Sequence, residues 1–168
     1  MTETLSPTLP PDVEALVTQV LRTACERGLK LVTAESCTGG LLASLLTDVD
    51  GCAHAFERGF VTYTDEAKTE LLDVPAEMIR TRTAVSAPVA QAMANGALAH
   101  SQGDVALSIT GYAGRGAADE EPGLVFFALA RKGADIRVDE RHFGDVGRGA
   151  VRVACLRHAL EMLRDAIA

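Results

Sequence analysis

Six consecutive residues concentrate reactive side chains and conformationally special ones in a single stretch. They are Glu35, Ser36, Cys37, Thr38, Gly39 and Gly40. A serine hydroxyl or a cysteine thiol can act as a nucleophile when a base accepts its proton. In the alternative interpretation, Ser36 or Thr38 only caps a helix and the two glycines only form the bend. The crowding of so many polar groups favours a functional site, without naming a reaction.

The residues on either side place this stretch at a turn between a strand and a helix. The branched apolar run Leu29–Val32 is typical of a buried strand, and Leu41–Leu46 has apolar residues at helical spacing. Ligands of open α/β sheets bind at the carboxyl ends of strands, and helix N-termini attract anions. We therefore expect an anionic or polar ligand at this turn.

Two later strand ends supply further polar groups: Tyr63 and Lys68 after the second strand, and Thr110 and Gly111 after the third. A serine nucleophile needs a base, and a lysine kept neutral by desolvation, or a tyrosine that relays the proton, can serve. Lys68 and Tyr63 are the candidates if their strand end lies beside Ser36. Cys37 is a second candidate nucleophile, because a helix N-terminus lowers the pKa of a thiol.

Other common site types find no support in the sequence. There is no Gly-x-Ser-x-Gly elbow, and the histidines at 54, 100, 142 and 158 are too dispersed to indicate a Ser-His-Asp triad. We expect His158 to be structural. The cysteines at 25, 37, 52 and 155 form no Cys-x-x-Cys pair, and no histidine–carboxylate motif indicates a metal.

Composition points to a protein of the cytoplasm. The chain has 168 residues, 48% of them hydrophobic, no tryptophan and a formal charge of −7. The acidic balance argues against a nucleic-acid-binding protein. No apolar run reaches membrane-spanning length, and Met1–Pro11 lacks the features of a secretory signal. We expect no membrane association and a cytoplasmic location.

Hydrophobic periodicity and turn residues predict the elements of the fold. These are a helix from Asp12 to Gly28, a strand over Leu29–Ala34, a helix from Leu41 to Asp50-Gly51, a strand over Phe56–Thr62, a helix capped by Thr64, a helical or irregular piece over Pro75–Arg82, a helix opened by Ser86 and Pro88, a strand over Val105–Ile109, a loop over 111–123, a hairpin of Leu124–Ala130 and Asp135–Phe143, and a last helix after Gly149.

This order of elements predicts an α/β fold, a three-layer α/β/α sandwich around a mixed, mostly parallel sheet. The sheet must be mixed because the late hairpin adds an antiparallel neighbour. We expect residues 1–11, which include three prolines, to form a flexible tail and residues 12–168 to form a single domain.

The sequence resembles the CinA C-terminal domain family, whose stand-alone members are similar to nicotinamide-nucleotide amidohydrolase (PncC-like). The resemblance spans roughly residues 12–165. It is carried by the motifs over residues 34–40, 56–63, 66–68, 84–86 and 108–114, together with Arg148 and residues 150–152.

The resemblance implies hydrolysis of the carboxamide of nicotinamide mononucleotide, without a metal or organic cofactor. It implies catalytic roles for Ser36, Tyr63 and Lys68. We add Thr38 to the catalytic group, because we expect Thr38 or Thr110, with the backbone N–H groups after Ser36, to stabilise the oxyanion. The substrate-binding residues expected are Glu35, Gly39, Gly40, Thr110, Gly111, Arg148 and Arg152. The two arginines have an alternative interpretation as ordinary surface charges. The expected partners are a small nucleotide substrate and further copies of the chain, in a homodimer or a higher homo-oligomer.

One segment departs from the family pattern. After Gly-x-Ala-Gly the family loop usually continues Pro-x-Gly-Gly, whereas this chain has Arg115-Gly116-Ala117-Ala118 and a shortened segment before Pro122. Because proline and paired glycines set loop shape, the change bears on substrate fit. Arg115 is a possible new phosphate contact. The altered loop leaves a second hypothesis open, that of a non-catalytic nucleotide-binding or interaction domain of the competence/damage-inducible type.

Overall fold

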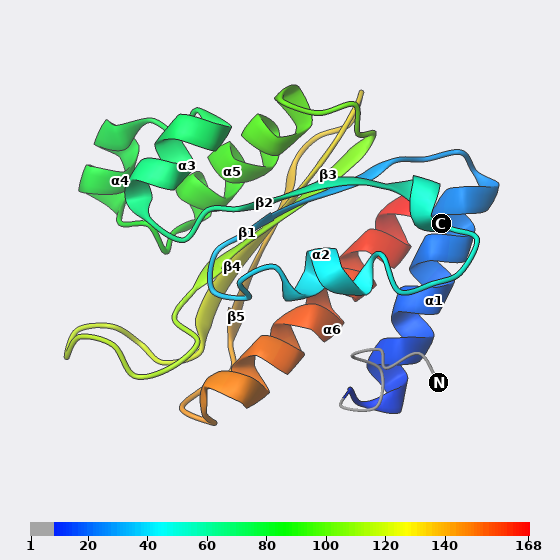
Figure 1. The fold of residues 1–168 in the computed structure, drawn as a ribbon. Coiled ribbons are helices and arrows are strands. Elements are labelled where there is room, and N and C mark those ends of the chain that lie inside the picture. Colours follow the sequence, from blue (N-terminus) through cyan, green and yellow to red (C-terminus); the bar gives the residue numbers. More distant parts are fainter. Residues whose placement is uncertain (1–8) are drawn as a thin grey trace.

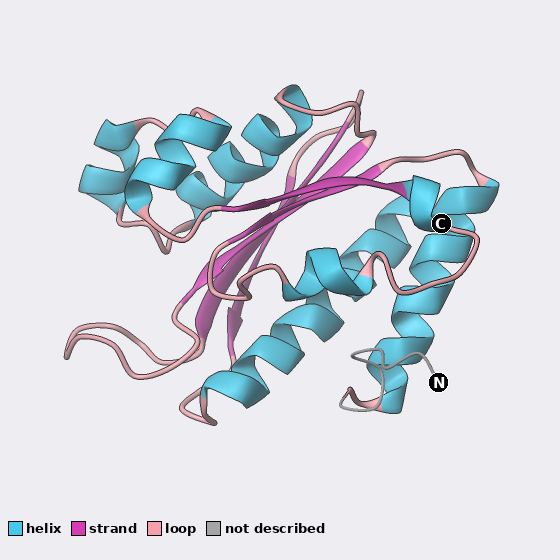
Figure 2. Ribbon diagram, in the orientation of Figure 1, coloured by secondary structure: helices cyan, strands magenta, loops and turns pink. Residues whose placement is uncertain are grey.

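The computed structural model describes residues 9–168 and contains one five-stranded sheet with helices on both faces (Figures 1 and 2). The expected tail over residues 1–11 falls mostly outside the described residues. The elements, in chain order, are α1 (Pro11–Glu26), β1 (Leu31–Glu35), α2 (Leu41–Leu45), the short 3₁₀ helix η2 (Ala53–Ala55), β2 (Phe56–Val61), α3 (Asp65–Leu72), α4 (Ala76–Arg82), α5 (Ala87–Ala99), β3 (Val105–Gly111), β4 (Leu124–Arg131), β5 (Arg137–His142) and α6 (Arg148–Ile167).

The strand order in the sheet is β2-β1-β3-β4-β5. β1 pairs in parallel with both β2 and β3, whereas β4 is antiparallel to both of its neighbours. Four of the five strands therefore run in the same direction. The predicted three-layer fold with a mixed, mostly parallel sheet is confirmed.

Helices bury both faces of the central strands. α1, α2 and α6 pack on one face, and α3, α4 and α5 cover the other (Figure 1). All five residues of β1 are buried, as are six of the seven in β3, whereas the edge strands β2 and β5 are mostly exposed or half-buried. This explains why the central strands are continuous apolar runs with little alternation.

Several element boundaries differ from prediction. α2 ends at Leu45, although the apolar spacing predicts a helix to Asp50. The chain tightens there into 3₁₀-type bonds, in which the N–H and the hydroxyl of Thr47 both donate to the carbonyl of Ser44. β3 runs two residues beyond Ile109, because Thr110 and Gly111 still pair with β4.

His158 is buried in α6, where its ring lies edge-on to Phe127 and hydrogen-bonds to Asp139 at 3.1 Å. Burial lowers the pKa of this imidazole. These contacts give His158 a place in the packing between α6 and the sheet, as expected. No helix within residues 9–168 is long and apolar enough to cross a membrane.

Candidate active site

Ser36 immediately follows the central parallel strand β1. Its backbone N–H donates to the carbonyl of Ile109 in β3 at 2.9 Å, and the N–H of Thr62, after β2, donates to the carbonyl of Glu35 at 2.8 Å. The turn that carries Ser36 is therefore fixed on both sides by neighbouring strands. The side chain is only 8% exposed, so its hydroxyl lies in a mostly water-excluded position.

Glu35 holds the helix that follows the serine. α2 begins after Gly40, which has a φ of 91° and no side chain with which to cap the helix. The fully buried carboxylate of Glu35 replaces the missing cap and accepts hydrogen bonds from the N–H groups of Leu42 (3.1 Å) and Ala43 (2.7 Å). A negative charge there also complements the helix dipole. The expected contact between Glu35 and substrate is not what this geometry favours.

Lys68 lies beside Ser36. Thr64 caps α3 by accepting from the N–H of Ala67, and Lys68 follows in the second turn. The side chain is 1% exposed. Its Nζ lies within hydrogen-bond distance of Ser36 Oγ, at 3.2 Å, and donates to the carbonyls of Thr62 (2.9 Å), Tyr63 (3.4 Å) and Thr64 (3.5 Å). Burial lowers the pKa of this amine, against the opposing effects of Asp65 and Cys37.

Both side chains open onto a cavity of about 320 Å³ at the carboxyl ends of β1 and β3. The cavity is lined by Ser36, Cys37, Tyr63, Asp65, Lys68, Ala84, Val85, Thr110, Gly111, Tyr112, Ala113, Gly114, Arg115, Gly116, Glu120 and Arg148. Of the expected site residues, Ser36, Tyr63, Lys68, Thr110, Gly111 and Arg148 are thus brought to one cleft. The volume is that of a small-molecule site.

The other expected catalytic groups are less directly placed. The Tyr63 side chain is 62% exposed at the mouth of the cleft, and among residues 9–168 no hydrogen bond joins its phenol to Lys68 or Ser36. Thr110 donates its hydroxyl to the carbonyl of Ala84 at 2.8 Å. Thr38 is fully buried and does not line the cavity. Neither threonine hydroxyl points freely at the position of a substrate carbonyl.

Gly39, Gly40 and Arg152 shape the turn and do not line the cavity. Both glycines have positive φ (60° and 91°), which a side chain would strain. The Arg152 guanidinium donates to the carbonyl of Thr38 at 2.7 Å, and a Cβ on Gly39 would lie 3.2 Å from it. Arg148, the first residue of α6, does line the cavity, and its side chain has no hydrogen bond or ion pair within the described residues.

The Cys37 thiol is 6% exposed and hydrogen-bonds with the buried Cys155 of α6. That bond, supported by the Arg152 guanidinium, holds the pKa of Cys37 below its usual value. Because its pKa is lowered, Cys37 remains an alternative to Ser36 as the nucleophile. However, no base of the kind that Lys68 offers to Ser36 is within hydrogen-bond reach of its thiol among residues 9–168.

The family model described as the CinA C-terminal domain matches residues 13–167. This chain belongs to the CinA C-terminal domain family. Nicotinamide-nucleotide amidohydrolase PncC of Escherichia coli (strain K12) is 46% identical over 140 residues, which cover 82% of this chain and 84% of that protein. A putative competence-damage inducible protein of Symbiobacterium thermophilum is 53% identical over 124 residues, 73% of this chain.

Those 124 residues are only 29% of the Symbiobacterium protein, and the chain spans about a third of the length of several other curated relatives of this CinA domain. A solved structure agrees closely with the fold. The competence/damage inducible protein CihA from Agrobacterium tumefaciens has a TM-score of 0.90 and 42% sequence identity, covering 95% of this chain and 97% of that one.

The loop over residues 111–123 contributes Arg115, Gly116 and Glu120 to the lining of the cleft. Arg115 lines the cavity, but its guanidinium is paired with Asp145 at 2.6 Å. Glu120 turns inward, where its carboxylate accepts from the N–H of Ala117 at 2.8 Å. The loop is therefore held by a hydrogen bond of its own and contributes the Glu120 carboxylate to the cavity wall. The charge of Arg115 is compensated by Asp145.

Three polar residues of the cavity were not predicted as site residues: Asp65, Tyr112 and Glu120. One signal for Asp65 was present, because it precedes Lys68 by three residues and so lies on the same helix face. Nothing in the sequence indicates that Glu120 turns inward. Within residues 9–168, no group of three or more histidines, cysteines or carboxylates is placed to hold a metal ion.

Proposed function

We propose that this CinA domain is a nicotinamide-nucleotide amidase, which hydrolyses the carboxamide of nicotinamide mononucleotide to nicotinate mononucleotide and ammonia. One observation carries the proposal: the buried amine of Lys68 lies 3.2 Å from the hydroxyl of Ser36 at the floor of a ligand-sized cavity. The activity for which the Escherichia coli relative is named supports the choice of substrate, because the two proteins match over most of both chains.

The hydrogen-bond partners of Lys68 suit a base. A neutral amine has two N–H donors and one lone pair, and an ammonium has three donors and none. In the neutral form the two donors go to carbonyls of Thr62, Tyr63 and Thr64, which leaves the lone pair to accept the proton of Ser36. Burial favours that neutral form. Ser36 Oγ then attacks the carboxamide carbon as its proton moves to Lys68 Nζ.

Collapse of the tetrahedral intermediate breaks the carbon–nitrogen bond. The Lys68 ammonium returns its proton to the leaving nitrogen, so ammonia departs and Ser36 is left as an ester of the nicotinate. Water then attacks the ester as Lys68 takes its proton. Lys68 returns that proton to Ser36 Oγ as the carbon–oxygen bond of the ester breaks, which restores the hydroxyl and the neutral amine and releases nicotinate mononucleotide. Direct transfer to Lys68 needs no relay, so we assign Tyr63 to substrate contact at the mouth of the cleft.

The oxyanion of the intermediate is assigned to backbone N–H groups that follow Ser36. Both threonine candidates are placed unfavourably, since the Thr110 hydroxyl is engaged with Ala84 and the Thr38 side chain lies outside the cavity. Fixed backbone donors in a water-poor site are effective at stabilising such charge. The nucleotide phosphate is assigned to Arg148, at the start of the 20-residue helix α6, beside the backbone of Gly114.

The test is ammonia release from nicotinamide mononucleotide by the purified chain, with free nicotinamide as the comparison substrate. We expect turnover of the nucleotide that is abolished by Ser36→Ala. Binding of the nucleotide by the unmodified chain without any release of ammonia would instead support the non-catalytic binding domain. The Ser36–Lys68 pair favours the enzyme, because a binding module has no need for a buried amine beside a serine.

A further inference from the structure

The catalytic cleft continues into a second cavity of about 660 Å³. The two share five lining residues: Asp65, Ala84, Val85, Tyr112 and Glu120. Ser36, Lys68 and Arg148 line the first cavity only. The shared residues therefore form the wall of the cleft on one side, and Arg148 belongs to another side.

The two sides differ in charge. Asp65 and Glu120 give the shared wall two carboxylates, and Asp119 and Glu121 add to the acidity of the second cavity. Arg148 supplies an unpaired guanidinium on the other side, whereas Arg115 is neutralised by Asp145. The Asp65 carboxylate has no hydrogen bond or ion pair in the part of the chain that the structure describes. The cleft is thus built for a ligand that carries both signs of charge.

The acidic wall is close to the reacting atoms. Asp65 precedes Lys68 by one helical turn on α3, and its charge acts on the pKa of that amine. Glu120 is held in place by the Ala117 N–H. Burial raises the pKa of Tyr112, whose ring lies on the same wall, and the negative charge of Glu120 raises it further. A carboxamide carbon placed at Ser36 brings the ring that bears it beside these groups.

We propose that Asp65 and Glu120 select the substrate through the positive charge of its pyridinium ring. This inference rests on the proposed function and assigns specificity within the same site. In nicotinamide mononucleotide the ring nitrogen is quaternary and cationic, and the phosphate is anionic. The two carboxylates and the face of Tyr112 attract the ring, and Arg148 attracts the phosphate. A neutral aromatic amide lacks the first attraction.

The test compares two ligands that differ in ring charge and share the ribose phosphate and the carboxamide. They are nicotinamide mononucleotide and its 1,4-dihydro form, whose ring is neutral. Binding to the full chain with Ser36→Ala, which prevents turnover, is measured by calorimetry at low ionic strength and pH 8. We expect the cationic ligand to bind at least about tenfold more tightly, a difference of about 1.4 kcal/mol.

The role of the two carboxylates is tested by introducing Asp65→Asn and Glu120→Gln into the chain with Ser36→Ala and measuring the affinity ratio of the two ligands. Glu120→Gln keeps an oxygen that can accept from Ala117, so the loop retains its hydrogen bond. We expect the double variant to bring the affinity ratio close to one, mainly by weakening the cationic ligand. Added salt should reduce the ratio in the parent, since exposed charges are screened.

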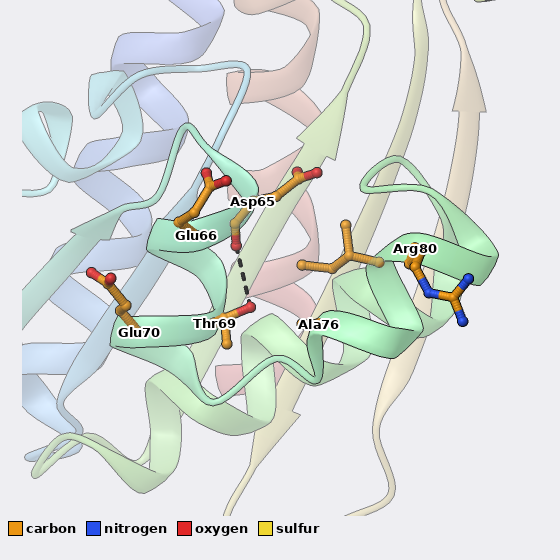
Figure 3. A pocket seen from close by; sticks show the side chains of 7 residues that line it. Asp65, Glu66, Thr69, Glu70, Ala76 and Arg80 are labelled. Carbon is orange, nitrogen blue, oxygen red and sulfur yellow. Dashed lines mark hydrogen bonds between the residues drawn. The ribbon is translucent and has the colours of Figure 1, made fainter.

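Glu70→Gln is the matched control. Glu70 lies on α3 like Asp65, but it lines only a third cavity of about 410 Å³ between α3 and α4, which Asp65 also borders, and it lines neither of the cavities that Asp65 and Glu120 share. Figure 3 shows the Glu70 carboxylate pointing away from that of Asp65. This variant changes net charge by the same amount as Glu120→Gln, and we expect the affinity ratio of the parent.

The inference is overturned if the double variant keeps the parental ratio, if Glu70→Gln lowers the ratio equally, or if neither ligand binds at millimolar concentration. Unfolding transitions that match the parent exclude loss of fold as the cause. Failure of the proposed function gives a different result. In that case the unmodified chain releases no ammonia, while the charge-dependent affinity ratio persists and identifies a pyridinium-nucleotide binding site.

Discussion

The Nζ atom of Lys68 lies 3.2 Å from the Oγ atom of Ser36, although the residues are 32 positions apart and belong to different elements. The parallel pairing of β1 with β2 creates this proximity, because it brings the carboxyl ends of the two strands to the same edge of the sheet. Ser36 follows one strand directly, and the helix after the other delivers Lys68. Each of the predictions below depends on this arrangement or on what maintains it.

Ser36 and Cys37 are neighbouring candidates for the nucleophile, and two alanine variants separate them. We expect Ser36→Ala to lower kcat by at least about 10³-fold, since a nucleophile and its base act as one unit. Cys37→Ala should keep kcat within a few-fold of the parental value, because the thiol of Cys37 hydrogen-bonds with that of Cys155 and not with Lys68. Ammonia release under saturating nucleotide measures both. The reverse pattern would assign the chemistry to the thiol.

Lys68→Met should remove the base and keep an apolar side chain of similar length. We expect kcat to fall by about 10²- to 10⁴-fold, the usual contribution of general base catalysis. Far-ultraviolet circular dichroism and the midpoint of thermal unfolding check that the fold survives. Turnover near the parental value would show that Lys68 only ties the strand ends together through its bonds to Thr62 and Tyr63.

The pH dependence of turnover should report the protonation of Lys68. The base must be neutral, so kcat/KM rises with pH through the pKa of this amine and then levels off. Burial moves that pKa below the usual lysine value, and the Asp65 carboxylate opposes the shift. Asp65→Asn removes the opposing charge, so its rising limb should lie at lower pH than that of the parent. An unshifted or upward-shifted limb would contradict the assignment of Lys68 as the base.

The fold was largely predictable because its central strands bear a simple signature. β1 and β3 are buried on both faces, so they read as short continuous apolar runs between turns. The end of α2 was not predictable from spacing alone, since leucines and a valine continue the helical pattern to Val49. There the hydrogen bonds of Thr47 to the carbonyl of Ser44 replace the helical pattern of backbone bonds. The spacing of hydrophobic residues does not predict such local hydrogen bonds.

The residues of the site also include some that were predictable from the sequence and some that were not. Residues at strand ends could be placed from order alone, and the structure brings Ser36, Lys68 and Thr110 to one cleft. The roles expected of Glu35 and Arg152 depended on side-chain direction. The structure turns one inward to cap α2 and the other onto the carbonyl of Thr38. Glu120 could not be foreseen, because its placement follows from how a long loop folds back on itself.

Glu35 should matter for stability and, through the position of Ser36, for turnover. Glu35→Ala leaves two N–H groups of α2 without their acceptor, at a cost of roughly 2 to 5 kcal/mol in unfolding free energy. Glu35→Gln retains one acceptor oxygen and should lose about half as much. Urea denaturation measures both variants, and kcat should fall with the loss of stability. Equal stability of the alanine variant and the parent would refute the capping role.

Gly96 should hold α3, and with it Lys68, at the required distance from α5. A Cβ at this position would lie 1.9 Å from the carbonyl oxygen of Leu72, the last residue of α3. Because the obstacle is backbone, Gly96→Ala must push the two helices apart, at about 1 to 3 kcal/mol or more. Gly149→Ala in α6 is the control. It meets no atom within 4 Å, and alanine is the better helix former by up to about 1 kcal/mol. Urea denaturation should show the first variant destabilised and the second unchanged or stabilised, and only the first should lose turnover as Lys68 moves away from Ser36.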